Sequence, residues 1–160
     1  MTRNTKQGRP GRLRWLRWLL IAGAAAPLLW FAGEAVWDDI LFRERGGMVY
    51  QNLSADEVAV LLAEREEVMP LDLRTDQEFA RGHLPQARRL GAAAGAGSGE
   101  PLTELDREQP CLIYCAGGFR SRLTLGKMRA LGFREVYHLN RGVLGWRLSG
   151  RELERDEAVE

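Results

Sequence analysis

The chain has 160 residues, of which 45% are hydrophobic and 28% are charged, and these proportions indicate one folded domain rather than a disordered chain. Two cysteines are too few for a disulfide scaffold, and two histidines leave little for a zinc site. The formal net charge of +1 conceals a basic N-terminal segment followed by a net acidic remainder.

Residues 1–17 form a basic N-terminal segment that carries no acidic side chain. A basic arm that binds nucleic acid is one interpretation of such a segment. The next residues favour another, because 18–33 are uncharged and mostly apolar, and the stretch from Trp18 to Trp37 has about the length that spans a bilayer. Its terminal tryptophans suit the two membrane interfaces. We therefore predict a transmembrane anchor (or an uncleaved signal) over residues 18–37, a membrane partner, and no nucleic-acid partner.

Three alternatives to an anchor compete for the same stretch. Small residues at 22–26 resemble the cleavage site of a signal peptide, although cutting there leaves a very short apolar run. A buried helix of the domain lacks a polar side to face water, and a membrane-surface helix needs a polar face that 18–33 does not have. Basic residues precede the stretch and acidic ones follow it, so the N-terminus is expected in the cytoplasm and the domain outside.

Arginine outnumbers lysine 21 to 2, which is typical of a GC-rich, bacterial genome. We therefore expect a single-pass protein of the bacterial inner membrane whose domain lies in the periplasm. Residues 38–47 are expected to be a linker, 48–150 the folded domain, and 151–160 a charged tail.

Strands and helices are predicted to alternate through the domain. Ser54 and Glu57 form a capping box that opens a helix, Pro70 removes one hydrogen-bond donor from a strand, and Gly132 ends a helix. This alternation indicates an α/β fold, a small mostly parallel β-sheet flanked by helices. Residues 91–99 are a glycine- and alanine-rich loop. The predicted strands cover 48–51, 68–73, 87–90, 111–114 and 135–139, and the predicted helices begin after 54 and cover 76–80, 120–131 and 143–148.

A loop at the end of the strand over 111–114 carries the candidate chemistry, since ligands of parallel sheets bind beyond the carboxyl ends of the strands. Cys115 follows this strand directly. The glycines of the loop can turn successive N–H groups inward, and the positive end of the next helix adds to their field. A thiol held there should have a lowered pKa. The loop consists of Ala116, Gly117, Gly118, Phe119, Arg120 and Ser121.

Three groups of residues stand in order along residues 50–148. The first is Leu71-Asp72-Leu73-Arg74, Glu78-Phe79 and Gly82-His83-Leu84-Pro85 with Ala87. The second is Tyr114-Cys115, Gly118, Arg120-Ser121 and Leu131-Gly132-Phe133. The third is Val136-Tyr137, Leu139, Gly142-Val143 and Trp146. Together they resemble the motifs of the single-domain rhodaneses, a family of sulfurtransferases.

The resemblance implies a two-step sulfur exchange at Cys115. This residue would take sulfane sulfur from a small donor such as thiosulfate, form a persulfide, and pass the sulfur to cyanide or a thiol. No metal or organic cofactor is implied, because sulfur itself is the covalent intermediate. The residues of loop 116–121 would bind the persulfide. Asp72, Arg74, Glu78 and His83 would be structural, forming an ion-pair and hydrogen-bond network without a part in the chemistry.

Other functions and roles stay open beside this reading. The domain could carry sulfur or bind a partner without catalysing transfer. Phosphatases and arsenate reductases on the same fold have one more residue between the cysteine and the arginine, so these activities are disfavoured. Arg120 is expected to face an anion, Ser121 either caps the helix or contacts substrate, and Phe119 either lines the mouth of the site or packs.

Several residues have simpler expected roles or depart from the family pattern. Cys111 lies about 13 Å from Cys115 along an extended strand, too far for a disulfide, and is expected in the core. Trp146 is expected to be a core aromatic residue. Gln86 and Arg141 stand where the family commonly has glycine, which affects the local shape of their loops.

Overall fold

A computed structural model describes residues 36, 40–42, 46–90 and 100–155 of the chain. Nearly all of the predicted membrane segment 18–37 lies outside the described residues, as does the 91–99 loop. Within the described part, no helix is both long enough and apolar enough to cross a membrane. The chain divides into two units, Met1–Ile40 and Leu41–Glu160. The fold described below is that of the second unit.

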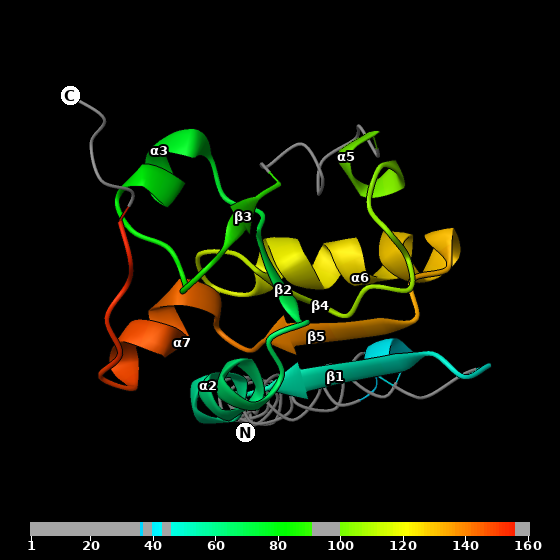
Figure 1. Cartoon of the computed structure of the whole chain (residues 1–160), viewed down its shortest axis with the longest axis horizontal. Helices are drawn as coiled ribbons and strands as arrows, with labels where there is room; N and C mark the ends of the chain where they lie inside the picture. Colours follow the sequence, from blue (N-terminus) through cyan, green and yellow to red (C-terminus); the bar gives the residue numbers. More distant parts are fainter. Residues whose placement is uncertain (1–35, 37–39, 43–45, 91–99, 156–160) are drawn as a thin grey trace, which may run out of the picture. The chain divides into compact units, whose positions relative to one another are not determined.

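Five parallel strands form a single sheet in the order β1-β5-β4-β2-β3 (Figure 1). The prediction of a mostly parallel sheet is confirmed, and every pairing in the described sheet is parallel. All five predicted strands are found within a few residues of their expected ends. They are β1 (Val49–Leu53), β2 (Met69–Asp72), β3 (Arg88–Arg89), β4 (Cys111–Tyr114) and β5 (Glu135–Leu139).

Helices connect these strands, as the alternating pattern predicts. The Ser54–Glu57 capping box is present at the start of the first helix, and Thr75 and Glu78 form a second one. One short helix, α5, was not predicted, since it has a single turn and contains a proline. The helices are α2 (Ala55–Glu64), α3 (Asp76–Ala80), α5 (Glu100–Thr103), α6 (Phe119–Leu131) and α7 (Gly142–Leu148).

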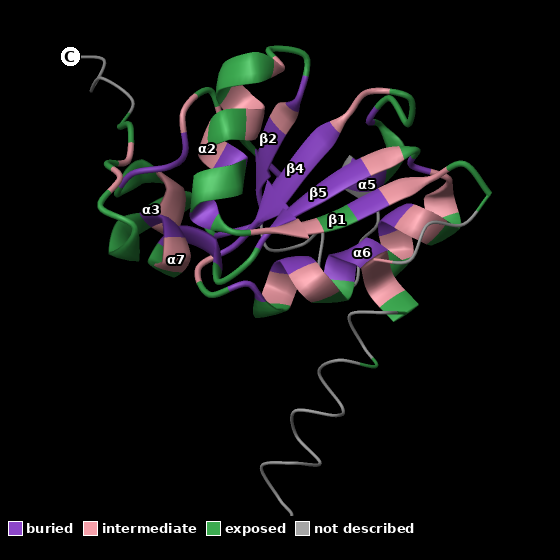
Figure 2. Cartoon of the chain, turned by 90° about the horizontal axis from the view of Figure 1, so that it is seen from below, coloured by how far each residue is buried: buried purple, intermediate pink, exposed green. Residues whose placement is uncertain are grey.

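The sheet separates two apolar clusters, with α2 and α6 on opposite sides of it (Figure 2). Side chains alternate between the faces of a strand, so Cys111 and Ile113 of β4 join the cluster that contains residues of α6. Leu112 and Tyr114 join the cluster of α2 and α7. Trp146 is buried in this second cluster, which confirms its expected core position, and its indole N–H donates to the Glu152 carbonyl at 2.9 Å. Both faces of β4 are therefore buried.

Residues 151–155, the described part of the expected charged tail, pack against the domain. The backbones of His83 and Glu154 exchange two hydrogen bonds of 2.8 Å in an isolated antiparallel bridge. Arg151 also makes an ion pair of 2.6 Å with Asp56 of α2. The segment that contains His83 is thus held by backbone contacts from the chain's last described residues.

Among the described residues, two that are not glycine adopt the left-handed backbone conformation, Gln86 with φ 56° and Arg141 with φ 62°. Both stand where the family resemblance leads one to expect glycine. At both positions the backbone keeps a conformation that glycine adopts easily. A residue with a Cβ adopts it at a cost in conformational energy.

Candidate active site

Cys115 lies at the carboxyl end of β4, between that strand and α6. Its side chain is 1% exposed and packs within the α6-side cluster. Gly118 takes a left-handed conformation with φ 93°, and this turn directs its N–H to the Cys115 Sγ at 3.2 Å. A Cβ at Gly118 would also lie 3.1 Å from the backbone nitrogen of Arg141. The loop therefore curls around the sulfur as the sequence predicts.

Hydrogen-bond donors converge on the Cys115 sulfur. Burial by itself raises the pKa of this thiol, because it disfavours the charged form. The Ser121 hydroxyl and the backbone N–H groups of Ser121, Gly117 and Gly118 act in the other direction and outweigh burial. The net result is a lowered pKa for Cys115, so the loop stabilises negative charge on the sulfur.

Ser121 contacts the sulfur from the first turn of α6 rather than capping that helix. The N-cap position is Gly118, and no side chain caps the helix there. The Ser121 Oγ lies 3.6 Å from the Cys115 Sγ, 3.0 Å from the Gly118 carbonyl oxygen and 2.9 Å from the His138 Nε2. The geometry therefore excludes the helix cap, one of its two expected roles, and places the Ser121 hydroxyl against the Cys115 sulfur.

Arg120 is held by an ion pair with Glu78. Its Nη2 lies 2.8 Å from Glu78 Oε1 and its Nη1 lies 3.1 Å from Glu78 Oε2. This pairing holds the pKa of Glu78 down, to about 2. Glu78 first and Cys115 to a lesser extent raise the pKa of Arg120. The Arg120 guanidinium thus interacts with Cys115, but the Glu78 carboxylate already neutralises much of its charge.

The four residues expected to form one structural network have different partners. Arg74 and Asp72 form a buried ion pair of 2.6 Å, and Arg74 also donates to the Gly82 carbonyl at 2.8 Å. His83 stacks on Phe79 with ring centroids 4.1 Å apart. Glu78 instead reaches the cysteine loop through Arg120. Some residues of the first sequence group therefore stabilise the segment that contains them, and Glu78 contacts the candidate active site.

Helix α7 contacts the cysteine loop through backbone hydrogen bonds. The N–H groups of Val143 and Leu144 donate to the carbonyls of Cys115 and Ala116 at 2.9 and 3.0 Å. Gly142 makes this close approach possible, since a Cβ there would lie 2.1 Å from the Cys115 carbonyl oxygen. These hydrogen bonds fix the backbone of Cys115 and Ala116, and so hold the Cys115 sulfur in a defined position.

His138 and Asn52 also belong to the site, and sequence reasoning did not identify them. His138 Nε2 lies 2.9 Å from Ser121 Oγ, and His138 Nδ1 lies 2.8 Å from Asn52 Oδ1. No local sequence motif indicates either residue, because they lie on β5 and β1 and approach the cysteine loop only in the folded sheet. The one available signal was that a histidine lies within an apolar strand.

Cys111 takes no part in this arrangement. It is a free thiol like Cys115, 2% exposed, and burial followed by the charge of Glu135 raises its pKa to about 12. Its expected core position is confirmed. Cys115 is therefore the thiol that the environment prepares for reaction.

A cavity of about 130 Å³ lies beside the loop and is lined by Gly117, Gly118, Phe119, Arg122, His138 and Asn140. Phe119 is 72% exposed at this cavity, so the structure supports a position at the mouth of the site rather than packing. The cavity lies next to the imidazole that contacts Ser121. It offers space for solvent or an incoming substrate close to the loop.

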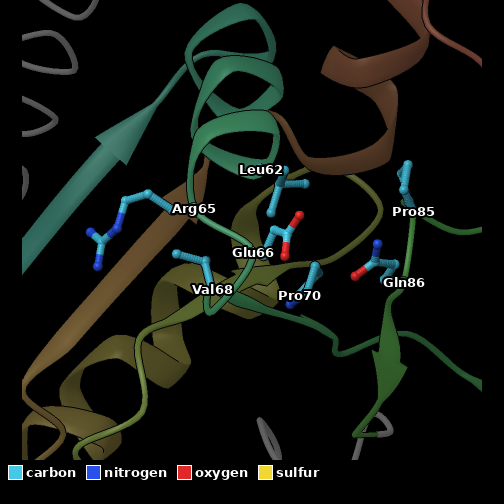
Figure 3. Close-up of a pocket in the computed structure, with 7 residues that line it drawn as sticks. All are labelled: Leu62, Arg65, Glu66, Val68, Pro70, Pro85 and Gln86. Carbon is cyan, nitrogen blue, oxygen red and sulfur yellow. The ribbon is translucent and has the colours of Figure 1, made fainter.

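A smaller cavity, of about 60 Å³, lies on the α2 side of the sheet between the end of α2 and the Pro85–Gln86 segment (Figure 3). It is lined by Leu62, Arg65, Glu66, Val68, Pro70, Pro85 and Gln86. None of these lining residues is a cysteine or histidine. In the described part of the chain, no group of three or more potential metal-binding side chains is present either.

The match with known proteins is concentrated in this domain. A model of the rhodanese-like domain family matches residues 54–149. The thiosulfate sulfurtransferase GlpE of Coxiella burnetii is 30% identical over 100 residues, which cover 62% of this chain and 90% of GlpE.

Two further matches share the domain. A tRNA uridine(34) hydroxylase of Sodalis glossinidius is 29% identical over 103 residues, but this chain spans only 29% of its length. The crystal structure of a rhodanese-like domain protein from Staphylococcus aureus has a TM-score of 0.56 at 25% identity, covering 67% of this chain and 99% of that one. The family model, which spans more than half of the sequence, shows that this chain belongs to the rhodanese-like domain family.

Proposed function

We propose that this protein is a thiosulfate sulfurtransferase that carries sulfane sulfur as a persulfide on Cys115. The observation that carries the proposal is the convergence of the Ser121 hydroxyl and three backbone N–H groups on the Cys115 sulfur, which lowers its pKa. A thiolate is the nucleophilic form of cysteine, and the same donors can stabilise a persulfide anion. The similarity to thiosulfate sulfurtransferases supports the same chemistry.

In the first step, the Cys115 thiolate attacks the outer sulfur of thiosulfate. A bond forms between Sγ and this sulfur while the sulfur–sulfur bond of thiosulfate breaks, and sulfite leaves with the electron pair. The product on the enzyme is the Cys115 persulfide anion. Gly117 and Gly118 bring their N–H groups to the side of the loop where this charge develops.

In the second step, cyanide or a thiolate attacks the outer sulfur of the persulfide. The new bond forms to that sulfur, the bond to Sγ breaks, and Cys115 recovers its thiolate with the electron pair. A lowered pKa makes Cys115 a better leaving group as well as a populated nucleophile at neutral pH. Neither step calls for a metal or an organic cofactor.

The form of the loop favours sulfur transfer over phosphatase or arsenate reductase activity. Only four residues separate Cys115 from Arg120, whereas a longer loop would make a wider cradle for a tetrahedral oxyanion. Arg120 is also engaged by Glu78, so its charge is partly neutralised before any substrate binds. Both observations support a site for a single sulfur atom.

Turnover of thiosulfate and cyanide to thiocyanate tests this proposal. We expect the full chain to form thiocyanate and the Cys115→Ser variant to form none, whereas Cys111→Ser should retain activity. A folded, reduced protein that is no more active than Cys115→Ser would contradict the proposal. Hydrolysis of an aryl phosphate in place of sulfur transfer would support the phosphatase alternative.

A non-catalytic role gives a different result in the same assay. A sulfur carrier or partner-binding module would accept sulfur on Cys115, or bind without accepting it, but would not turn over with cyanide. Measuring bound sulfur after removal of thiosulfate therefore separates a carrier from an enzyme.

We also propose that residues 18–37 anchor the domain in the bacterial inner membrane, with the domain in the periplasm. The basic residues before the segment and Glu34, Asp38 and Asp39 after it support this orientation. A tag at the N-terminus should stay with membranes after a high-salt wash, and external protease should reach the domain in spheroplasts. Recovery of a tag-free soluble domain would indicate a cleaved signal instead.

A further inference from the structure

A chain of three polar side chains leads away from the Cys115 sulfur into the protein. Cys115 Sγ lies 3.6 Å from Ser121 Oγ, Ser121 Oγ lies 2.9 Å from His138 Nε2, and His138 Nδ1 lies 2.8 Å from Asn52 Oδ1. His138 is 1% exposed. These contacts connect the loop, α6, β5 and β1 through two buried side chains, Ser121 and His138, and one partly exposed side chain, Asn52.

The Ser121 hydroxyl lies within hydrogen-bond distance of three acceptors, Cys115 Sγ, the Gly118 carbonyl and His138 Nε2, and with Cys115 as a thiol it donates to the last of these. The Asn52 carbonyl oxygen can only accept, so His138 carries a hydrogen on Nδ1. A neutral imidazole then has its lone pair on Nε2, which accepts from the Ser121 hydroxyl. The Ser121 oxygen is left to accept a hydrogen bond from the Cys115 thiol. With Cys115 as a thiol, each donor along this path points from Cys115 toward Asn52, and with Cys115 as a thiolate the Ser121 hydroxyl donates to the sulfur instead.

We propose that His138 receives the Cys115 proton through Ser121 and thereby controls ionisation of the thiol. The S–H bond breaks, its proton passes to the Ser121 oxygen, and the Ser121 hydroxyl proton passes to His138 Nε2. Cys115 keeps the electron pair as a thiolate, and His138 becomes an imidazolium. His138 is a positioning residue in this account, because it acts on the sulfur only through Ser121.

The hydrogen bonds fit the state after transfer as well as the state before it. The new Nε2–H can donate to the Ser121 oxygen and to the Gly118 carbonyl at 3.2 Å, while Nδ1–H still donates to Asn52. The Ser121 hydroxyl then donates to the thiolate. Ser121, His138 and Asn52 each keep a hydrogen-bond partner in both states, so the transfer avoids the cost of an unsatisfied buried donor.

The surroundings of His138 set the balance between the two states. Burial, and then the positive charge of Arg122 on α6, lower the pKa of His138 to about 4, against the opposing hydrogen bond to the Gly118 carbonyl, so the imidazolium is disfavoured by itself and forms only together with the thiolate. The Phe42 ring packs 5.9 Å from the imidazole, and the Asn52 side chain from β1 is uncharged. The thiolate formed at Cys115 supplies the compensating negative charge. The 130 Å³ cavity, which His138 lines, gives the proton a route to solvent.

This inference rests on the proposed function, since a relay to Cys115 matters only if its thiolate reacts. It is nevertheless testable without any sulfur donor, because the rate of Cys115 alkylation by iodoacetamide follows the thiolate fraction. The pH profile of this rate would be measured on the full chain, with the labelled cysteine identified by peptide mass. Cys111 is buried and serves as an internal control for loss of the fold.

Two variants should move the profile in opposite directions. His138→Gln keeps a hydrogen-bonding side chain but cannot accept the proton, so the midpoint should rise by about one pH unit. Asn52→Asp places a carboxylate against Nδ1, favours the imidazolium, and should lower the midpoint by a similar amount, about one unit. Thermal unfolding of each variant would establish that it is folded at the assay temperature.

The double variant Ser121→Ala/His138→Gln adds the test of connection. Its profile should match that of Ser121→Ala alone, since His138 acts only through Ser121. A His138→Gln profile that coincides with the unmodified protein would overturn the relay, as would additive shifts in the double variant. If the shifts occur but thiosulfate leaves no sulfur on Cys115, the relay stands and the proposed function fails.

Discussion

The carboxylate of Glu78 and the guanidinium of Arg120 form a two-pronged ion pair, with contacts of 2.8 and 3.1 Å. Glu78 is also the third residue of the α3 capping box, so its two oxygens join that helix to the cysteine loop. The two residues are 42 positions apart in sequence. Glu78, which belongs to the first of the three sequence groups, thus holds Arg120, the arginine of the loop that follows Cys115.

This ion pair makes part of the stability dependent on pH. Because pairing lowers the pKa of Glu78 from 4.5 to about 2, the contribution is present above pH 4.5 and is lost as the pH falls toward 2. Glu78→Gln should therefore lose about 1 kcal/mol at pH 7 and much less at pH 2.5. Urea unfolding at both values measures the difference. Glu64→Gln is the matched control, since it removes a carboxylate from the exposed end of α2 and leaves the Glu78–Arg120 pair in place.

Gly142 is predicted to be indispensable for the position of the loop. An alanine Cβ would lie 2.1 Å from the Cys115 carbonyl, so backbone must move. Gly142→Ala should destabilise the fold by about 3 kcal/mol and lower thiocyanate formation. The matched control is Gly126→Ala within α6, where a Cβ meets nothing within 4 Å. That change should stabilise the protein by about 0.5–1 kcal/mol, and equal effects of the two would contradict the packing account.

Local signals explain which elements the sequence predicts well. The strands Cys111–Tyr114 and Glu135–Leu139 and the helix Asp76–Ala80 have their predicted limits, because apolar runs and capping residues mark them. Helix α5 has no such mark, since it is a single turn. Cys115 and its loop could be predicted for the same reason, as they are contiguous in sequence.

Contacts between residues far apart in sequence could not be predicted from local sequence patterns. The Glu78–Arg120 pair, the His138–Ser121 contact and the Asn52–His138 contact depend on the strand order β1-β5-β4-β2-β3. That order places β5 between β1 and β4, and so brings His138 between Asn52 and the loop. Residue spacing along the chain carries no direct information about such an arrangement.

Gln86 should gain from replacement by glycine. Its φ of 56° is unfavourable for a residue with a Cβ, while its N–H bond to Glu154 at 3.1 Å would be retained. Gln86→Gly should stabilise the protein by about 0.5–1 kcal/mol, the relief of strain less the added freedom of the unfolded chain. The same change at Gln51 in β1 should destabilise it by a similar amount, about 0.5–1 kcal/mol. Chemical unfolding of both variants tests whether the sign differs.

Arg74 is predicted to stabilise the fold rather than to act on substrate. Arg74→Met would leave Asp72, which is fully buried, without its cation, and should cost about 3–5 kcal/mol. The same replacement at Arg134, whose pair with Glu108 is exposed, should change stability by less than about 1 kcal/mol. Activity per folded molecule of Arg74→Met should stay within several-fold of the unmodified protein. A selective loss of turnover in a stable variant would point to a direct role instead.

Intact mass after exposure to thiosulfate alone tests the central claim most directly, because it detects the intermediate without requiring the right acceptor. The reduced protein and Cys111→Ser should each gain one sulfur atom, Cys115→Ser should gain none, and cyanide should remove the added sulfur. A folded, reduced protein that gains no sulfur, or an adduct that persists in Cys115→Ser, would contradict this claim.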